Sequence, residues 1–390
     1  MSGCVLSSQN RFYVGLESTY GTAPSVDASN RMSAVVLRMA QRREVRRRRD
    51  KTGGRTFTGL APGSRRRTEF SVETYLVENT SPSTPPAVGA LVEAGLGAAP
   101  AIFTGRTAGS GSSTTQINFG SSHGLVKGQA FVWDGELRFV ATVNSSTQVT
   151  VNAPFSSAPS SGSSLAPAVT YFPAYELPSV SIFDYWDPAA AVQRILTGGT
   201  VDRLEVRVNA DYHELPFSGE AQDVVDSVSF ESGDGGLSSF PVEPSLAGEY
   251  PPPIPGNLGQ AWLGDPVSKY FTVTSAVVRL HNDIDLRNRE FGTSTPQCIA
   301  PGVRNATAEI ELFETDSAAT RSLFASAQAE TPIQVMFQLG QTAGQLLGVH
   351  MPAVVPELPR FDDTDRILRW RFENSRAQGT VDDEIAVAFG

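Results

Sequence analysis

The feature that most constrains the fold of this chain is an internal repeat, because repetition fixes the architecture of both halves at once. The tetrapeptide Ser-Ala-Val-Val occurs at residues 33–36 and again at 275–278. Each copy is followed by a basic–acidic pair, at 49–50 and 289–290, and then by Ala-Pro-Gly. Because these matches occur in the same order and at similar spacing, they indicate a duplicated domain.

Both copies continue with the same succession of predicted elements. Alternating apolar and polar residues predict a half-buried strand around Phe70 in the first copy and around Ile310 in the second. Apolar residues at helical spacing then predict helices within 87–96 and 316–328. A further alternating strand ends each copy. The predicted fold class is mainly β, with two tandem domains that each carry one flanking helix.

The first copy contains an insertion. The segment from Ala-Pro-Gly to the final Phe has 156 residues in the first copy and 72 in the second. Low-complexity Gly/Ser stretches at 105–113 and 156–164 enclose several short alternating strands. Two of these strands meet across Asp134-Gly135, a strong hairpin signal. We expect residues 100–172 to form a small inserted β-barrel or sandwich.

Composition agrees with many short strands and turns, since the 390 residues include 35 glycines and 26 prolines and only 18% are charged. Residues 232–266 are rich in proline and glycine and are predicted to be a linker. The predicted domains are then 1–99 together with 173–231, the insertion 100–172, and 267–390.

The charge is distributed unevenly along the chain. The net charge is −10, yet residues 42–67, here called the basic segment, contain eleven basic residues and two acidic ones. Residues 211–265 contain ten acids and neither Lys nor Arg. This complementarity predicts self-association between the basic segment of one subunit and an acidic face of the next. The alternatives are a solvated loop and nucleic-acid binding, although Phe57 is the only aromatic residue in the segment.

Motifs for catalysis or cofactor binding are not found in the sequence. Cys4 and Cys298 lack the paired spacing of a zinc site, and the four histidines are scattered. No phosphate-binding loop or hydrolase nucleophile motif occurs. Asp362, Asp363 and Asp365 form an acidic cluster that could hold a cation or be a solvated loop. We therefore expect no catalytic residue, no cofactor, no metal site and no enzymatic activity.

The sequence also bears on location. No apolar run reaches the 18 or so residues of a membrane helix, and the N-terminal residues lack the pattern of a signal peptide. We expect a protein that is made and used in the cytoplasm and has no membrane partner.

Three segments of the sequence have a recognisable pattern: residues 11–24 (RFYVGLESTYGTAP), the long polar excursion before the strand at 69–76, and the closing residues 382–390 (DDEIAVAFG). Together they resemble the tail tube (major tail) proteins of long, flexible-tailed bacteriophages. The resemblance covers most of the chain apart from the insertion. It implies β-sandwich or β-barrel domains that assemble into rings, and rings that stack into the hollow tail tube through which phage DNA passes.

The resemblance also implies an assembly. If one ordinary tube domain forms six-membered rings, a chain with two copies would fill a ring with three subunits, with hexameric rings as the alternative. The implied partners are further copies of the chain, the tape measure protein, and tail terminator and tip proteins. DNA would pass through an acidic lumen without specific binding, and the inserted domain would project outward. The implied location is the virion tail, assembled in the host cytoplasm.

In such proteins a long loop between early strands reaches the neighbouring ring, and the matching segments here are 41–68 and 283–306. Two other functions stay open: a distal tail or baseplate adaptor that forms a single ring, and a nucleic-acid-binding module that uses the Arg-rich segment. The residues expected to contact the next ring are Arg46, Arg47, Arg48, Arg49, Asp50, Arg65, Arg66, Arg67, Arg289 and Glu290.

Overall fold

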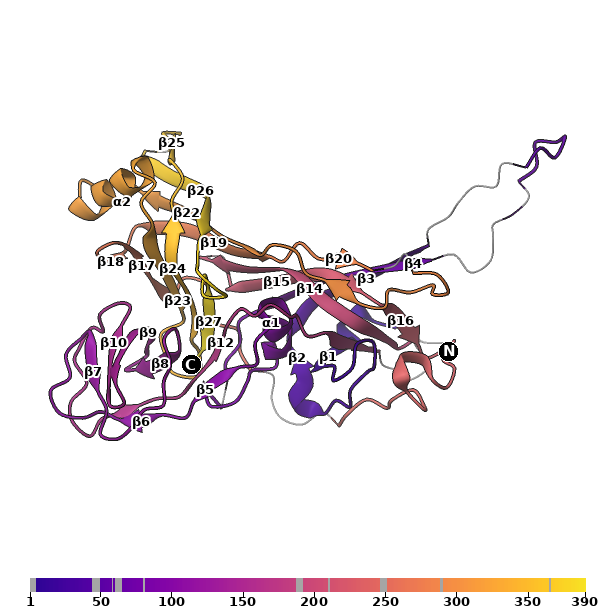
Figure 1. Ribbon diagram of the computed structural model, residues 1–390, viewed down its shortest axis with the longest axis horizontal. Helices are drawn as coiled ribbons and strands as arrows, with labels where there is room; N and C mark the ends of the chain where they lie inside the picture. The colour runs from indigo at the N-terminus through magenta and orange to yellow at the C-terminus, as the bar shows by residue number, and fades with distance from the viewer. Residues whose placement is uncertain are drawn as a thin grey trace.

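The chain is mainly β, with a large antiparallel sheet, a smaller β module and, in the described residues, two α-helices (Figure 1). The structure is a computed structural model. It describes residues 5–43, 50–57, 59, 65–79, 81–186, 192–209, 211–245, 251–287, 290–364 and 366–390. Short 3₁₀ helices occur at Ser7–Gln9, Ala28–Asn30 and Asp234–Gly236.

The first repeat is built from seven strands and one helix. They are β1 (Arg11–Leu16), β2 (Arg31–Met32), β3 (Ala34–Arg43), β4 (Arg66–Tyr75), α1 (Gly89–Leu96), β13 (Val180–Tyr185), β14 (Arg194–Val208) and β15 (Glu214–Ala221). Antiparallel pairing gives the order β2-β1-β13-β14-β15-β4-β3. The short strand β16 (Asp223–Asp226) continues β15 along β14.

The second repeat has the same topology. Its elements are β17 (Gly259–Gly264), β18 (Ser268–Tyr270), β19 (Val273–His281), β22 (Asn305–Phe313), α2 (Ala318–Gln328), β23 (Ile333–Leu339), β24 (Leu347–Val355) and β26 (Arg369–Ala377). They pair in the order β18-β17-β23-β24-β26-β22-β19. Both the chain order and the neighbours of each strand therefore match those of the first repeat.

A β-bulge at the same place in both hairpins sets the structural alignment of the repeats. The β3–β4 register shifts between Ala34 and Val36, and the β19–β22 register shifts between Val273 and Ser275. Aligning the hairpins on this bulge makes Ala34 equivalent to Val273. The two Ser-Ala-Val-Val segments are thus displaced from each other in the structure, because backbone pairing and not residue identity fixes the register.

The two repeats are joined through their sheets. The second half of β14 pairs with β19, from Arg203 opposite His281 to Val208 opposite Ala276. At the far end, β25 (Arg360–Asp362) pairs with β26. One sheet therefore runs β3-β4-β15-β14-β19-β22-β26-β25, and we call it the long sheet. Its core face belongs to a hydrophobic cluster that includes residues of both repeats and of both helices.

Parts of the predicted linker 232–266 belong to the folded repeats. Leu237 and Phe240 pack on an aromatic cluster of the first repeat, and residues 259–264 form β17, which pairs with β18 and β23. The proline run that dominates the composition occupies only the middle of the segment. Leu237 and Phe240 before it are partly buried, and Ala261, Trp262 and Leu263 after it are buried, which favours packing of both ends onto the repeats.

The inserted module is smaller than its predicted range. Two strands at the ends of the range 100–172, β5 (Ala101–Phe103) and β12 (Ala168–Tyr171), pair with each other, and β12 also pairs with the C-terminal strand β27 (Ala386–Phe389). This pairing makes both strands part of the main sheet, and Val169 and Tyr171 of β12 belong to its core cluster. The module proper lies between the two strands.

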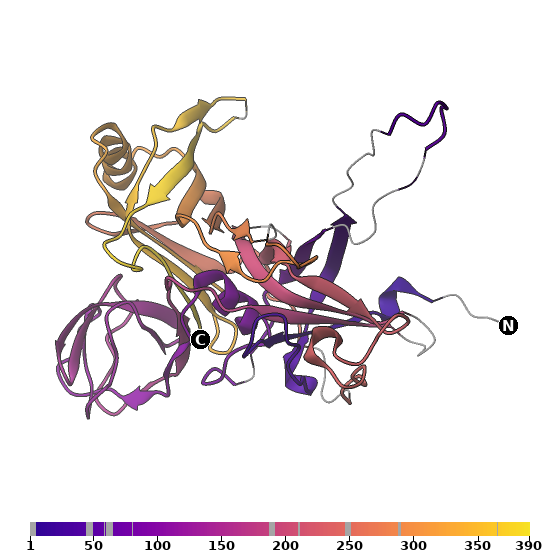
Figure 2. The ribbon, with the colours of Figure 1, turned by 45° about the vertical axis from the view of Figure 1, so that its right-hand side comes forward.

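The module contains β6 (Arg106–Thr107), β7 (Gln116–Asn118), β8 (Ala130–Trp133), β9 (Glu136–Ser145), β10 (Gln148–Val151) and β11 (Ser164–Leu165). Strands β7, β10, β9 and β8 form a curved sheet, and β6 pairs with β11. The predicted hairpin at Asp134-Gly135 is present, with φ of 49° and 70°. Figures 1 and 2 both show the module on the opposite side of the molecule from the projecting β3–β4 hairpin.

Small β elements complete the second repeat. Strand β20 (Asp285–Leu286) pairs with β21 (Ile299–Ala300) within the excursion between β19 and β22. No helix among the described residues has the length and apolar character needed to span a membrane.

Candidate functional site

The exposed face of the long sheet is covered by alternating basic and acidic side chains. In β22, Ile310 and Leu312 are buried while Glu309 and Glu311 point outward. The same alternation of apolar core residues and charged outer residues occurs in the neighbouring strands. We call this surface the ion-paired face. Its charged residues include Arg38, Arg42, Arg67, Glu69, Glu73, Arg203, Glu205, Arg207, Glu214, Glu220, Arg279, Glu309, Glu311, Arg360, Arg369, Arg371 and Glu373.

Glu309 shows how the ion-paired face is organised. Its carboxylate accepts a hydrogen bond of 2.9 Å from Nη1 of Arg279 and one of 3.0 Å from Nε of Arg371. Partial burial opposes ionisation, but the hydrogen bonds from the two arginines lower the pKa of Glu309 below its ordinary value. One carboxylate thus engages arginines from the strands on both sides of its own.

The ion pairs continue across the junction of the repeats. Glu205 on β14 lies opposite Arg279 on β19, with 3.4 Å between Oε1 and Nε. Arg207 contacts both Glu205, at 3.2 Å, and Glu214, at 2.8 Å. Each exposed pair contributes at most about 1 kcal/mol to stability. Their larger effect is on the electrostatic potential of the surface, because each of the arginines named above lies within 4 Å of a carboxylate.

The two ends of the long sheet are open edges. Among the described residues, β3 pairs only with β4, and β25 pairs only with β26. Both edge strands expose an apolar side chain, with Val35 61% and Phe361 58% exposed. An unpaired edge is a template for another strand.

Each open edge strand is the structural counterpart of one of the two strands, β19 and β14, that join the repeats. β3 occupies in the first repeat the place that β19 occupies in the second. β25 pairs with the first part of β26, as the second half of β14 pairs with the first part of β15. The β14–β19 junction inside the chain therefore has its two counterparts, β25 and β3, at opposite ends of the same sheet.

Five of the residues predicted to contact the next ring lie outside the described residues. They are Arg46, Arg47, Arg48, Arg49 and Arg289.

Asp50 lies in the described part of the hairpin tip, residues 50–57, and is exposed, as are its neighbours in that range. Figures 1 and 2 show this tip well beyond the body of the protein, past the ends of β3 and β4.

The structure brings Arg65 and Glu290 together at the base of the two excursions. Nη2 of Arg65 donates to the backbone oxygen of Glu290 at 3.3 Å, and the backbone N–H of Arg66 donates to the oxygen of Ser294 at 2.8 Å. The carboxylate of Glu290 accepts from Arg287. The two segments predicted to reach the next ring thus contact each other within one chain.

The remaining predicted arginines have acidic partners in the same chain. Arg66 lies 3.1 Å from Asp223, and Arg67 contacts Glu220 and, at 3.4 Å, Glu69. Two of these carboxylates belong to the acidic stretch 211–265. Part of the predicted attraction between the basic segment and that stretch is therefore made within the subunit.

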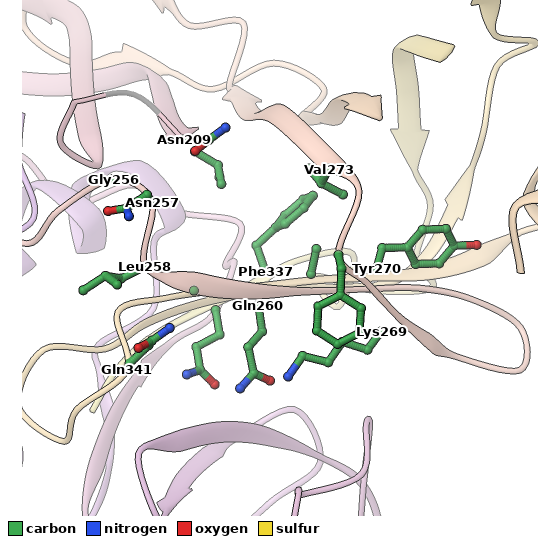
Figure 3. A pocket seen from close by; sticks show the side chains of 15 residues that line it. Asn209, Gly256, Asn257, Leu258, Gln260, Lys269, Tyr270, Val273, Phe337 and Gln341 are labelled. Atoms are coloured by element: carbon green, nitrogen blue, oxygen red, sulfur yellow. The ribbon is translucent and has the colours of Figure 1, made fainter. Parts of the chain in front are cut away.

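A pocket of about 360 Å³ lies at the repeat junction, between the end of β14 and strands β17, β18 and β23. Figure 3 shows Asn209 and Val273 on one side of the strand that crosses the view and Gln341 on the other. The one charged residue that lines the pocket is Lys269, and its ammonium group lies over the rings of Trp262 and Phe271. The lining brings together no group of acids, bases or nucleophiles.

The acidic cluster is only partly described, since Asp365 lies outside the described residues. The carboxylate of Asp362 accepts hydrogen bonds from the hydroxyl and the backbone N–H of Thr364, at 2.6 and 3.0 Å, and these lower its pKa. Within the described ranges, no three His, Cys, Asp or Glu residues gather as metal ligands would.

Sequence reasoning missed the ion-paired face. The signal was available in the alternation of charges along 305–313 and 369–377, which places Glu309 and Arg371 on one side of their strands. It could not reveal that β22 pairs with both β19 and β26, or that β19 pairs with β14, because these pairings join distant segments. No protein-family model matches this sequence, and no curated protein matches it significantly.

Proposed function

We propose that this protein is a structural subunit that associates head to tail into closed rings, and that stacked rings form the tail tube of a bacteriophage. The observation that carries the proposal is the correspondence between the internal β14–β19 junction and the open edges β25 and β3. In the proposed contact, edge strand β25 of one chain pairs with edge strand β3 of the next. This is a heterologous contact, and it closes into a ring when the rotation between neighbouring chains allows.

Equivalent pairings locate the residues of this contact. Asp362 pairs with Arg369, and Arg207 pairs with Glu214, at corresponding places in β26 and β15. Asp362 in β25 is therefore the counterpart of Arg207 in β14.

The internal junction then supplies the register between chains. Arg207 lies opposite Val277 of β19, and alignment on the bulge makes Arg38 the counterpart of Val277 in β3. Between two chains, this register places Asp362 opposite Arg38 of the next subunit. An opposite-charge pair at directly facing positions favours antiparallel pairing.

The neighbouring position supports the same register. One residue earlier in β25 is Phe361, and the position facing it in β3 of the next chain is Met39. Both side chains belong to the core side of the sheet, where Phe361 contacts Trp370 and Met39 packs on the main cluster. Pairing the two edges would bury Phe361 and extend the core from one chain into the next.

Three chains provide six repeats, so we propose a trimeric ring with pseudo-sixfold symmetry. The inserted module does not obstruct the ion-paired face, because it docks through Gln260, Gln338 and His350, on strands that are not part of the long sheet. The exposed hairpin tip at 50–57 and the predicted contact arginines are proposed to bind the adjacent ring.

Electron microscopy of the assembled protein viewed end-on, together with the mass of any soluble ring, tests the proposal. The expected result is three chains per ring, about 125 kDa for a chain of 41.7 kDa. Six chains per ring would contradict the pairing of β25 with β3 in a trimer, and a chain that stays monomeric would contradict assembly. Single rings that never stack would favour the adaptor function instead.

Replacing Arg46, Arg47, Arg48 and Arg49 by alanine tests the stacking step separately. We expect normal rings and fewer or shorter tubes, because the charge that attracts the acidic surface of the next ring is removed. Tubes of parental yield and length would contradict a role of these arginines in stacking.

A further inference from the structure

The ion-paired face presents arginines in an arrangement suited to polyanions. Side chains of Arg38, Arg207 and Arg371 are 70%, 47% and 48% exposed, and they stand on one sheet surface. Guanidinium groups bind phosphates through paired hydrogen bonds and are weakly hydrated. Without its carboxylates, this surface would have the composition of a phosphate-binding site.

The carboxylates engage the donors that a phosphate would need. Nη1 of Arg279 and Nε of Arg371 both donate to Glu309, and Nε of Arg279 is also within 3.4 Å of Glu205. A phosphate that binds either arginine through these nitrogens has to displace a carboxylate already in contact, and it is repelled by that carboxylate's charge.

We propose that the carboxylates of the ion-paired face, with Glu205 and Glu309 at its centre, prevent an arginine-rich sheet surface from retaining a polyanion. The identification of that polyanion as double-stranded DNA in transit rests on the proposed function. The electrostatic property itself belongs to the single chain and does not require a ring.

The core face of the long sheet is covered by its own hydrophobic cluster, including residues of α1 and α2, so the ion-paired face is the free surface of the sheet. Placing this free surface in the lumen of a ring rests on the proposed function. A lumen lined in this way would carry balanced charge, in contrast to the acidic lumen that the resemblance implies. DNA would slide because arginine and carboxylate neighbours leave neither strong attraction nor strong repulsion.

The test compares DNA binding by the full-length parent chain and by the double variant Glu205→Gln/Glu309→Gln. The probe is a short fluorescent DNA duplex, titrated at several salt concentrations. Glutamine keeps the shape of the side chain and removes the charge. The matched control is Asp316→Asn/Glu330→Gln, which changes net charge equally at exposed positions flanking α2. The basic segment is common to all three proteins, so its binding cancels in the comparison.

We expect the double variant to bind DNA at least about tenfold more tightly than the control at low salt. Its plot of log affinity against log salt should steepen by about 1 to 2, because each new phosphate contact contributes about 0.9. Adding Arg279→Gln to the double variant should remove much of this gain.

Equal affinity of the double variant and the control would overturn the inference, as would a gain that persists after Arg279→Gln. Thermal melts of all proteins identify any loss of folding, and a variant that loses stability without gaining DNA affinity would assign these ion pairs a structural role only. Ring formation is scored separately by electron microscopy. Failure to form rings would contradict the proposed function while leaving the DNA-binding result interpretable.

Discussion

Nη2 of Arg138, in the inserted module, donates a hydrogen bond of 3.0 Å to Oε1 of Gln260 on β17 of the second repeat. Arg138 is fully buried, and its guanidinium also contacts Glu136 at 3.0 Å and lies over the ring of Trp262. Burial lowers the pKa of Arg138 to about 10, so the side chain stays charged at neutral pH. This contact holds the module on the repeat instead of leaving it tethered by its Gly/Ser stretches.

Replacing Arg138 by methionine should therefore destabilise the protein strongly. The carboxylate of Glu136 would remain buried without its cation, and loss of one partner of a buried pair costs about 3–5 kcal/mol. Denaturant unfolding measures the change. The double variant Arg138→Met/Glu136→Gln should recover part of the loss, and a single variant with parental stability would contradict the role of this contact.

The hairpin turn of the module gives a second prediction, based on two glycines with positive φ. Gly135 has φ +70°, and an added Cβ would lie 2.3 Å from the backbone oxygen of Gln341, whereas Gly162 has φ +86° and open space around it. Gly162→Ala should cost about 1 kcal/mol for the backbone conformation alone. Gly135→Ala should cost clearly more, because the module must also shift from Gln341. Equal unfolding free energies for the two variants would contradict this close approach.

His350 on β24 predicts a pH dependence of stability. It is buried and stacked on Phe139 of the module, with 5.1 Å between ring centroids. Burial, with a smaller contribution from the charge of Lys127, lowers the pKa of His350 from 6.5 to about 3. As pH falls below 6.5 the unfolded chain binds a proton that the folded chain does not, so the free energy of unfolding decreases.

The decrease attributable to His350 should approach about 1.4 kcal/mol per pH unit between pH 6 and pH 4. Stability measured over this range for the parent and for His350→Phe tests it, because the variant lacks this slope. His281→Gln, at a half-exposed position, serves as the control. Parallel curves for the parent and His350→Phe would show that His350 does not titrate in this way.

The proposed contact between chains predicts a charge reversal with rescue. Arg38→Glu places two acids opposite each other in the β3–β25 register, and rings should be lost or much reduced. Asp362→Arg alone should act similarly, and the two changes together should restore assembly. The monomer should stay folded. Within the chain Arg38 forms an exposed ion pair with Glu73, at 3.4 Å, and loss of such a pair costs little stability. Failure of the double variant to recover rings, while both single variants lose them, would reject this register.

Much of the local structure could be predicted from the sequence. The strands around Phe70 and Ile310, the helices within 87–96 and 316–328, and the turn at Asp134-Gly135 follow from short-range periodicity and turn chemistry. These features depend on residues a few positions apart, so a single sequence is sufficient to detect them.

The sequence did not determine how distant segments meet. The ion pairs of Glu309 with Arg279 and Arg371 require three strands to be neighbours, and the contact of Arg138 with Gln260 joins the insertion to the second repeat. Sheet register, which also displaced the two Ser-Ala-Val-Val segments, is set by backbone pairing and burial over the whole domain. Only the tertiary structure therefore decided which charges are paired and which strand edges remain open.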